Sequence, residues 1–162
     1  DEIAKAKVPS SIIMIEAPGG KLETLDVSMT NGAALEKAGA LTGFHTDDYI
    51  TDSRLFLRSA GLAVRNGMSR EKALYGMTMA GAIMLDMQDR VGSLEAGKDA
   101  DFIVLSGEPL SVYTHVLQTY VDGNKVFDRV NLGDLLIATG GLGASNDKNL
   151  HLDCFDGDGG QE

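Results

Sequence analysis

The sequence predicts an α/β fold in which helices cover a parallel sheet, and three consecutive segments carry this prediction. Ser11 to Glu16 (SIIMIE) is almost continuously apolar and rich in β-branched residues, as expected for a strand buried on both faces. Asn31 to Gly39 (NGAALEKAG) has the composition of a short helix, and Leu41 to His45 (LTGFH) follows as a second short strand. A strand, a helix and a strand in this order indicate the β-α-β rhythm of a parallel sheet.

Short segments bound these elements. Asp1 to Ala6 (DEIAKA) has the pattern of the end of a helix, and Pro18-Gly19-Gly20 ends the first strand. The loop that continues into Lys21 lacks the spacing of a phosphate-binding loop, so we interpret it as a plain connection, although it could contact a substrate. Gly39 stands where a helix C-terminus favours a residue in the left-handed conformation.

Two helices are predicted in the middle of the chain, after a polar segment from Thr46 to Ser53 (TDDYITDS). The first runs from about Arg54 to Arg65 and ends at Asn66-Gly67. Ser69 is a good N-cap for the second, which runs roughly from Arg70 to Met84. Apolar residues recur there at helical steps, which predicts one buried stripe, and core packing is favoured over a binding surface. The stripe contains Ala73, Leu74, Met77, Ala80 and Met84.

The pattern changes after Asp89. Ala100 to Leu105 (ADFIVL) and Val116 to Val121 are predicted strands, and Asp122-Gly123-Asn124 makes a hairpin turn into a further strand from Lys125 to Phe127. Because a two-stranded hairpin is at best marginally stable in water, this part is expected to need a partner sheet.

Composition and charge exclude several function classes. The formal net charge of −10 argues against nucleic-acid binding, and no apolar run is long enough to span a membrane. Cys154 is the single cysteine, so it has no partner for an internal disulfide. The chain begins at Asp1 without a methionine, so we expect an excised or truncated product, and the cellular compartment stays open.

The densest polar cluster follows the second predicted strand. It contains His45, Asp47 and Asp48, with Thr51 and Arg54 close behind. The carboxyl ends of parallel strands are where α/β proteins bind ligands. Two adjacent carboxylates beside a histidine can bind a divalent metal, act as a general base or cap the next helix, and spacing alone leaves these alternatives open. Asp52 and Ser53 are also well placed to cap the next helix.

Two segments of the chain resemble the C-terminal portion of the amidohydrolase superfamily, and the imidazolonepropionase-related group in particular. LTGFHTDD resembles the eighth barrel strand of that superfamily, which ends in Ser/Thr-Asp. DRVGSLEAGKDADFIVL, followed by a hairpin with VDGNKVF, resembles the segment that leaves the barrel and adds strands to a small β-sandwich. The preceding ALYGMTMAGAIMLDM is similar to the usual helix before that segment. The resemblance extends from Gly39 to Phe127.

The resemblance implies the C-terminal part of a (β/α)8 TIM barrel, comprising about strands 7 and 8 with their flanking helices, plus C-terminal strands of a small β-sandwich. Residues 1–88 would then belong to the barrel of a metal-dependent hydrolase and residues 89–130 to the sandwich. Residues 131–162 form a tail rich in Gly and Asp, which we expect to be loosely held or disordered.

The resemblance also implies the chemistry. Family members hold one or two divalent metal ions, often zinc, that activate a water for attack on an amide, lactam or related C–N bond of a small-molecule substrate. Asp47 matches the aspartate that binds metal and takes a proton from the water. His45, Asp48, Thr51 and Arg54 are candidates to line the substrate pocket or to hold Asp47 in place.

The other ligands of the family, a His-x-His and further residues on earlier strands, have no counterpart in this chain, whose histidines are His45, His115 and His151. A single aspartate does not hold a catalytic metal, so we expect the isolated chain to be inactive and metal-free. It would need the N-terminal barrel portion of the same enzyme as its partner, and its open strand edges favour a homo-oligomer. The alternative is a non-catalytic barrel and sandwich module used for packing or assembly.

Overall fold

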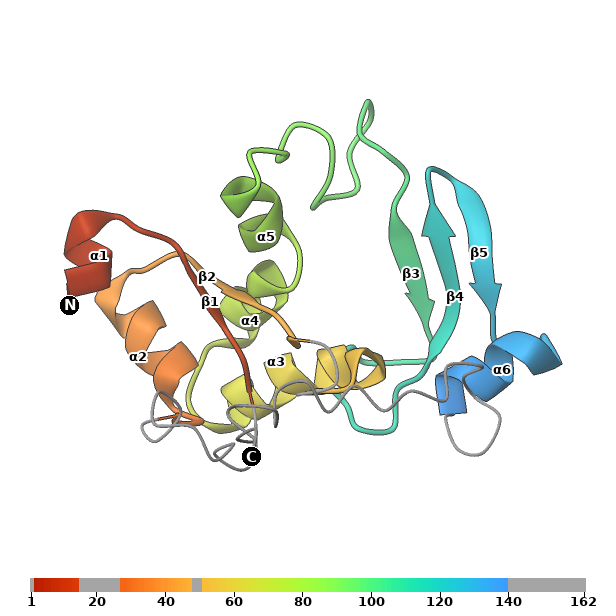
Figure 1. Ribbon diagram of the computed structural model, residues 1–162, viewed down its shortest axis with the longest axis horizontal. Coiled ribbons are helices and arrows are strands. Elements are labelled where there is room, and N and C mark those ends of the chain that lie inside the picture. Colours follow the sequence, from red (N-terminus) through yellow and green to blue (C-terminus); the bar gives the residue numbers. More distant parts are fainter. Residues whose placement is uncertain (1, 15–26, 48–50, 140–162) are drawn as a thin grey trace, which may run out of the picture.

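The computed structural model describes residues 2–14, 27–47 and 51–139. Figure 1 shows two parts side by side, one with helices α1 to α5 around strands β1 and β2, the other with strands β3 to β5 and helix α6. Within these described ranges, no helix has both the length and the apolar character needed to cross a membrane.

The predicted β-α-β unit is confirmed. Strand β1 (Ser10–Ile12) pairs in parallel with β2 (Thr42–Phe44), and helix α2 (Asn31–Ala38) connects them. A short helix α1 (Glu2–Ala6) precedes β1, as expected. The last two residues of the predicted first strand and the Pro18-Gly19-Gly20 loop lie outside the described residues.

The expectation that the first strand is buried on both faces is wrong for β1. Ser11 is exposed, and Ser10 and Ile12 are only half-buried. The physical reason is that β2 is the strand's only neighbour in the sheet as far as the described ranges show. By contrast, all three residues of β2 are buried, because helices cover it.

Helix α2 ends at Gly39, as the sequence predicts. Gly39 adopts a left-handed conformation with a φ of 80°. The amide of Gly39 donates to the carbonyl oxygen of Glu36, and the amide of Ala40 donates to that of Leu35. These bonds satisfy carbonyl groups that the helix itself leaves unpaired, which is why the helix ends here.

The first helix of the middle segment begins with a turn of 3-10 helix. The 3-10 turn η2 spans Ser53–Leu55, and α3 continues over Phe56–Arg65. Asp52 caps the turn by accepting a hydrogen bond from the backbone amide of Arg54 at 2.9 Å. One of the predicted capping residues is thereby confirmed.

The single helix predicted from Arg70 to Met84 is wrong, because the segment forms two helices, α4 (Arg70–Gly76) and α5 (Met79–Met84). Thr78 separates them with non-helical angles of −133° and −90°. A Cβ at Gly76 would lie 2.8 Å from the ring of Phe44, so α4 packs closely on β2 at the residue where the first helix ends. The predicted N-cap is confirmed, since Ser69 Oγ accepts from the amide of Lys72.

The buried core lies entirely within this first part of the molecule. Ala60 and Ala63 of α3 and Ala73 of α4 have no exposed surface, so that the two helices pack closely on each other, and α4 packs on β2. The predicted stripe on α4 and α5 is buried or half-buried throughout, which agrees with its interpretation as core. The main cluster of buried residues comprises Met14, Phe44, Ala60, Ala63, Met68 and Ala73.

The second part is a three-stranded antiparallel sheet in the order β3-β4-β5. Its strands are β3 (Phe102–Leu105), β4 (Val116–Val121) and β5 (Asn124–Asp128), close to the predicted bounds. Asp122 and Gly123 have φ angles of 50° and 73°, which is the two-residue hairpin turn that the sequence predicts. The rings of Phe102 and Tyr120 stack at 4.5 Å across the first pair of strands.

Helix α6 (Leu132–Thr139) was not predicted from the sequence. Asn131 starts it by accepting hydrogen bonds from the amides of Gly133 and Asp134 through its side-chain oxygen. The side chain of Asp134 in turn accepts from the amide of Asp128 at 2.8 Å, which ties the helix to the end of β5. The start of the tail is therefore ordered as a helix, and the residues after 139 lie outside the described part.

Candidate functional site

The polar cluster lies at the carboxyl end of a parallel strand, as the sequence predicts. Strand β2 ends at Phe44, and His45, Thr46 and Asp47 follow directly. Because β1 and β2 run in parallel, the carboxyl ends of both strands meet at this edge. Edges of this kind are where α/β proteins place their ligand-binding groups.

Asp47 has an unusual backbone conformation. Its φ is 54°, in the left-handed region that non-glycine residues rarely adopt, and its side chain is exposed. Aspartate tolerates this region better than most residues, because its short polar side chain can bond locally. The conformation turns the chain sharply at the strand end and leaves the carboxylate accessible. A reversal of this kind at a strand edge is a common feature of functional sites.

His45 is held by the neighbouring strand. Its ring Nδ1 lies 2.8 Å from Ser11 Oγ, and its backbone amide donates to the carbonyl oxygen of Ile12 at 3.1 Å. The first contact joins side chains from the two parallel strands, and the second extends their ladder by one residue. Ser11 was not identified in the sequence, because its partner is 34 positions away.

Thr51 closes the loop that follows the strand. Its backbone amide donates to the carbonyl oxygen of Thr46 at 3.1 Å, and the residue is half-buried. Thr51 therefore lies near the strand end that carries Asp47. Asp48, the other acidic candidate, falls outside the described residues.

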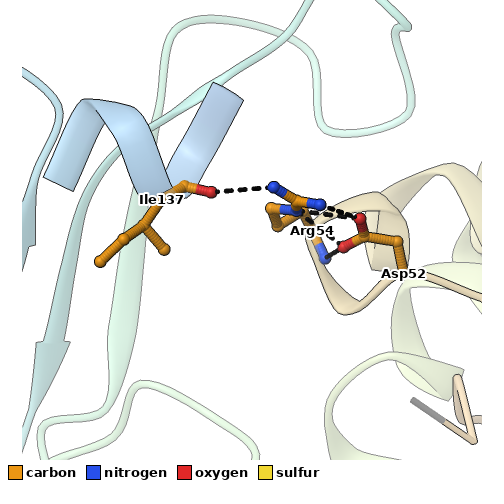
Figure 2. Close-up of polar contacts among 3 residues, drawn as sticks. All are labelled: Asp52, Arg54 and Ile137. Carbon is orange, nitrogen blue, oxygen red and sulfur yellow. Dashed lines mark hydrogen bonds and ion pairs between the residues drawn. The ribbon is translucent and has the colours of Figure 1, made fainter. Parts of the chain in front are cut away.

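Arg54 is engaged in a different place. Figure 2 shows its guanidinium against the carboxylate of Asp52, with a further hydrogen bond to the carbonyl oxygen of Ile137 on α6. Its Nε atom lies 2.9 Å from both carboxylate oxygens, and hydrogen bonding from Arg54 lowers the pKa of Asp52 below its ordinary value. Arg54 therefore connects the two parts of the molecule.

Arg54 and Asp52 lie at the rim of a cleft of about 1010 Å³ that includes neither His45 nor Asp47 in its lining. The cleft separates α3 from the sheet and from α6. It is lined by apolar side chains and by arginines from both parts, and its wall also includes His115. Sequence reasoning did not identify this cleft, because its walls come from segments far apart in the chain. The arginines are Arg54, Arg58, Arg65 and Arg129.

The donor set at the strand end is incomplete for a metal ion. In the described part of the chain, no three His, Cys, Asp or Glu side chains gather closely enough to bind one. Asp47 offers one exposed carboxylate, and His45 offers one ring nitrogen besides the one that contacts Ser11. Catalytic zinc sites need at least three protein ligands, so these residues fit a shared site and do not make a complete one.

Comparisons with known proteins match most of this region. The model of the amidohydrolase family matches residues 25–127. An imidazolonepropionase of Desulfotalea psychrophila is 42% identical over 83 residues, which cover 47% of this chain and 20% of that protein. Adenine deaminase 2 of Shouchella clausii is 39% identical over 90 residues, covering 52% of this chain and 15% of that protein.

A solved structure is similar as well. The crystal structure of an amidohydrolase from Thermotoga maritima MSB8 aligns with a TM-score of 0.75 at 34% identity, and the match covers 79% of this chain and 33% of that one. The chain thus spans a fifth or less of the length of these two curated relatives and a third of the solved structure.

Proposed function

The chain belongs to the amidohydrolase family, as its two recognisable segments predict, and from this premise we propose that it supplies part of the active site of an enzyme that hydrolyses a C–N bond. The substrate is a small molecule with an amide, lactam or related cyclic amide bond. Asp47 is the residue of this chain that would bind the metal ion and accept a proton in the reaction. The remainder of the site comes from the N-terminal barrel portion of the same enzyme.

One observation carries the proposal. Asp47 stands exposed at the carboxyl edge of two parallel strands, in a strained left-handed conformation, at the position that resembles the family's strand-ending aspartate. Lys7, Asp86 and Asp122 share this conformation, so it is the place of Asp47 at the carboxyl edge of the two parallel strands that distinguishes it. Capping of the next helical turn is done by Asp52 instead, which leaves Asp47 available for another role.

The chemistry of Asp47 fits the proposal. A divalent metal ion, for which we expect zinc, would lower the pKa of a bound water and so provide the nucleophile. The Asp47 carboxylate is a suitable ligand for that ion and also a suitable acceptor for the proton that the water loses. His45 and Thr51 lie at the same strand end and are proposed to line the substrate pocket, together with Asp48. The position of Arg54 at the cleft favours a structural role over substrate contact.

The fold supports a place for the chain within the whole enzyme. We assign β1 and β2 to strands 7 and 8 of a (β/α)8 barrel, and β3 to β5 to a small β-sandwich. The edges of both sheets offer unpaired backbone groups along the described strands, which suits pairing with further strands. We expect the complete enzyme to be a homo-oligomer.

The proposal is tested by Asp47→Asn in the complete enzyme. Asparagine keeps the size and tolerates the left-handed conformation, but it is neutral and a poor proton acceptor. Turnover of a cyclic amide or lactam substrate should therefore fall by two orders of magnitude or more, with an unchanged melting temperature. Asp86→Asn is the matched control, because Asp86 is also exposed, with a φ of 56°, but follows helix α5. Equal activity of both variants would remove Asp47 from the site.

A second candidate is a non-catalytic module that retains the fold for packing or assembly. It is favoured by the incomplete donor set, because the residues that the structure describes bring together no group of three potential ligands. Metal analysis separates the candidates. The catalytic proposal requires one or two divalent ions bound per complete enzyme and a lower occupancy in Asp47→Asn, whereas the module requires neither.

A further inference from the structure

The side chains of Ser11 and His45 lie on the same face of the parallel sheet, opposite to Ile12 and Phe44. Ser11 is paired with Gly43 in the register of the two strands, and His45 follows Gly43 by two residues, so both side chains project to the same face. Ile12 and Phe44 project to the opposite face, where they pack in the core under the helices. Met84 of α5 approaches the first face at Gly43, where a Cβ would lie 3.1 Å from the methionine methyl group, and His45 lies beyond that point at the strand end.

The contact between them determines which nitrogen of His45 is available. The 2.8 Å distance joins Ser11 Oγ to Nδ1, and the imidazole is exposed. Nε2 makes no hydrogen bond to any residue within the described ranges, so it is the ring atom open to a ligand. When Nδ1 accepts from the serine hydroxyl, the neutral ring carries its proton on Nε2 and acts there as a donor.

We propose that Ser11 is a positioning residue that holds His45 in the Nε2–H form, so that Nε2–H donates a hydrogen bond to the carbonyl oxygen of the substrate. This inference rests on the proposed function, because it requires a C–N substrate beside Asp47. A hydrogen-bond donor complements the carboxylate of Asp47, which only accepts. The carbonyl oxygen gains negative charge as water attacks the carbon, so a fixed donor stabilises that state more than the ground state.

The step leaves the protons of His45 in place. The water oxygen forms a bond to the carbonyl carbon, the C=O π electrons move to the oxygen, and Asp47 accepts the proton that the water loses. His45 keeps its Nε2 proton throughout and contributes only the hydrogen bond. Ser11 contacts no reacting atom and acts through His45.

The tautomer can be measured on the 162-residue chain, independently of catalysis. With ¹⁵N-labelled histidine, long-range ¹H–¹⁵N correlation spectra distinguish Nε2–H from Nδ1–H, at a pH well above the ordinary histidine pKa of about 6.5. The chain has three histidines, and the His45→Gln variant identifies the signals of His45. We expect wild-type His45 in the Nε2–H form, a mixture of tautomers in Ser11→Ala, and the wild-type form again in Ser11→Thr, which restores the hydroxyl.

Kinetic measurements on the complete enzyme test whether His45 Nε2–H donates to the substrate. Ser11→Ala should lower kcat by about tenfold or more with little change in KM, because the hydrogen bond is strongest in the transition state. Ser11→Thr should recover most of the loss. A purely structural role of Ser11 would leave the tautomer and the split between kcat and KM unchanged.

The outcomes separate this inference from the proposed function. An Nδ1–H tautomer in the wild type overturns the inference even when Ser11→Ala fails to fold, and so does a Ser11→Ala enzyme with normal kcat. Full activity of Asp47→Asn overturns the proposed function instead, and it leaves the tautomer result as it stands.

Discussion

The two parts of the molecule differ in how they bury apolar surface. Every described residue that is fully buried lies between Met14 and Ala82, around the parallel strands. From residue 83 to residue 139, no described residue is fully buried. The first part therefore has a core of its own, whereas the second part has a regular sheet without one.

The second part exposes the side chains that such a core would use. Its exposed large apolar residues occur on all three strands, in the loop before β4, in the turn after β5 and on α6. Large exposed apolar surface of this kind marks sites that another element covers. The residues are Ile103, Val104, Val112, Tyr113, Leu117, Val121, Val126, Val130, Leu132, Leu136 and Ile137.

The junction between the parts is mostly polar. Arg54 reaches the carbonyl oxygen of Ile137, and Arg70 forms an ion pair with Glu108 at 2.5 Å. Leu110 is the one apolar residue of the second part, within its described range, that packs on the main core cluster. Exposed ion pairs contribute about 0–1 kcal/mol each, so this junction holds the parts together weakly. Regular secondary structure therefore persists in the second part although a local core is lacking.

The substitution expected to change stability most lies in the core of the first part. Gly76→Ala places a Cβ 2.8 Å from the Phe44 ring and 2.9 Å from the carbonyl oxygen of Thr42, and the backbone atom cannot move aside. We expect the free energy of unfolding of the first part to fall by about 1–3 kcal/mol, as measured by urea denaturation.

Gly81→Ala is the matched control, because it also lies in a short helix but meets no atom within 4 Å. That change should be neutral or stabilise by up to about 1 kcal/mol through helix propensity. Equal losses at the two positions would show that the packing of α4 on β2 is looser than the structure indicates.

A substitution with a smaller effect on stability tests whether another element covers strands β3 to β5 in the complete enzyme. Val126 is 57% exposed here, so Val126→Thr should change the stability of this chain by less than about 0.5 kcal/mol. In the complete enzyme, where we expect a partner sheet over the same residue, the substitution should cost about 1 kcal/mol or more, because the hydroxyl is then buried. The measurement is thermal unfolding of both proteins. The same small change in both would mean that nothing covers β5.

The smallest change in stability is expected at the junction of the two parts, where the Asp52–Arg54 ion pair makes stability depend on pH. Hydrogen bonding to Arg54 lowers the pKa of Asp52 below its ordinary value of 3.8, so the pair stabilises the folded chain above that pH. The stabilisation is lost as the pH falls through the lower pKa of the folded state. Asp52→Asn keeps a capping side chain for η2 and should cost less than about 1 kcal/mol at neutral pH. Chemical denaturation of both proteins should show this difference disappearing at acid pH; a difference that persists would exclude the carboxylate charge as its cause.

The candidate site was predictable only in part. The position of His45 and Asp47 after a parallel strand follows from the local pattern of an apolar strand and a polar loop. Arg54 was grouped with these residues because it follows them closely in the sequence. In the structure, Arg54 lies at the cleft and contacts Asp52 and Ile137. Ser11 carries no local signal, since a serine within an apolar strand is unremarkable until its neighbour in the sheet is known.

The elements that could be predicted from the sequence are those with local signals. The β-α-β unit, the stop at Gly39, the Ser69 cap and the Asp122-Gly123 turn all depend on the conformational preferences of a few adjacent residues. Three features became known from the folded structure, namely the break in the helix after Gly76, the contact between Ser11 and His45 and the helix over Leu132–Thr139. Each of these depends on a contact or hydrogen bond made through the folded chain, and the energy of such a contact exceeds the small differences in local propensity.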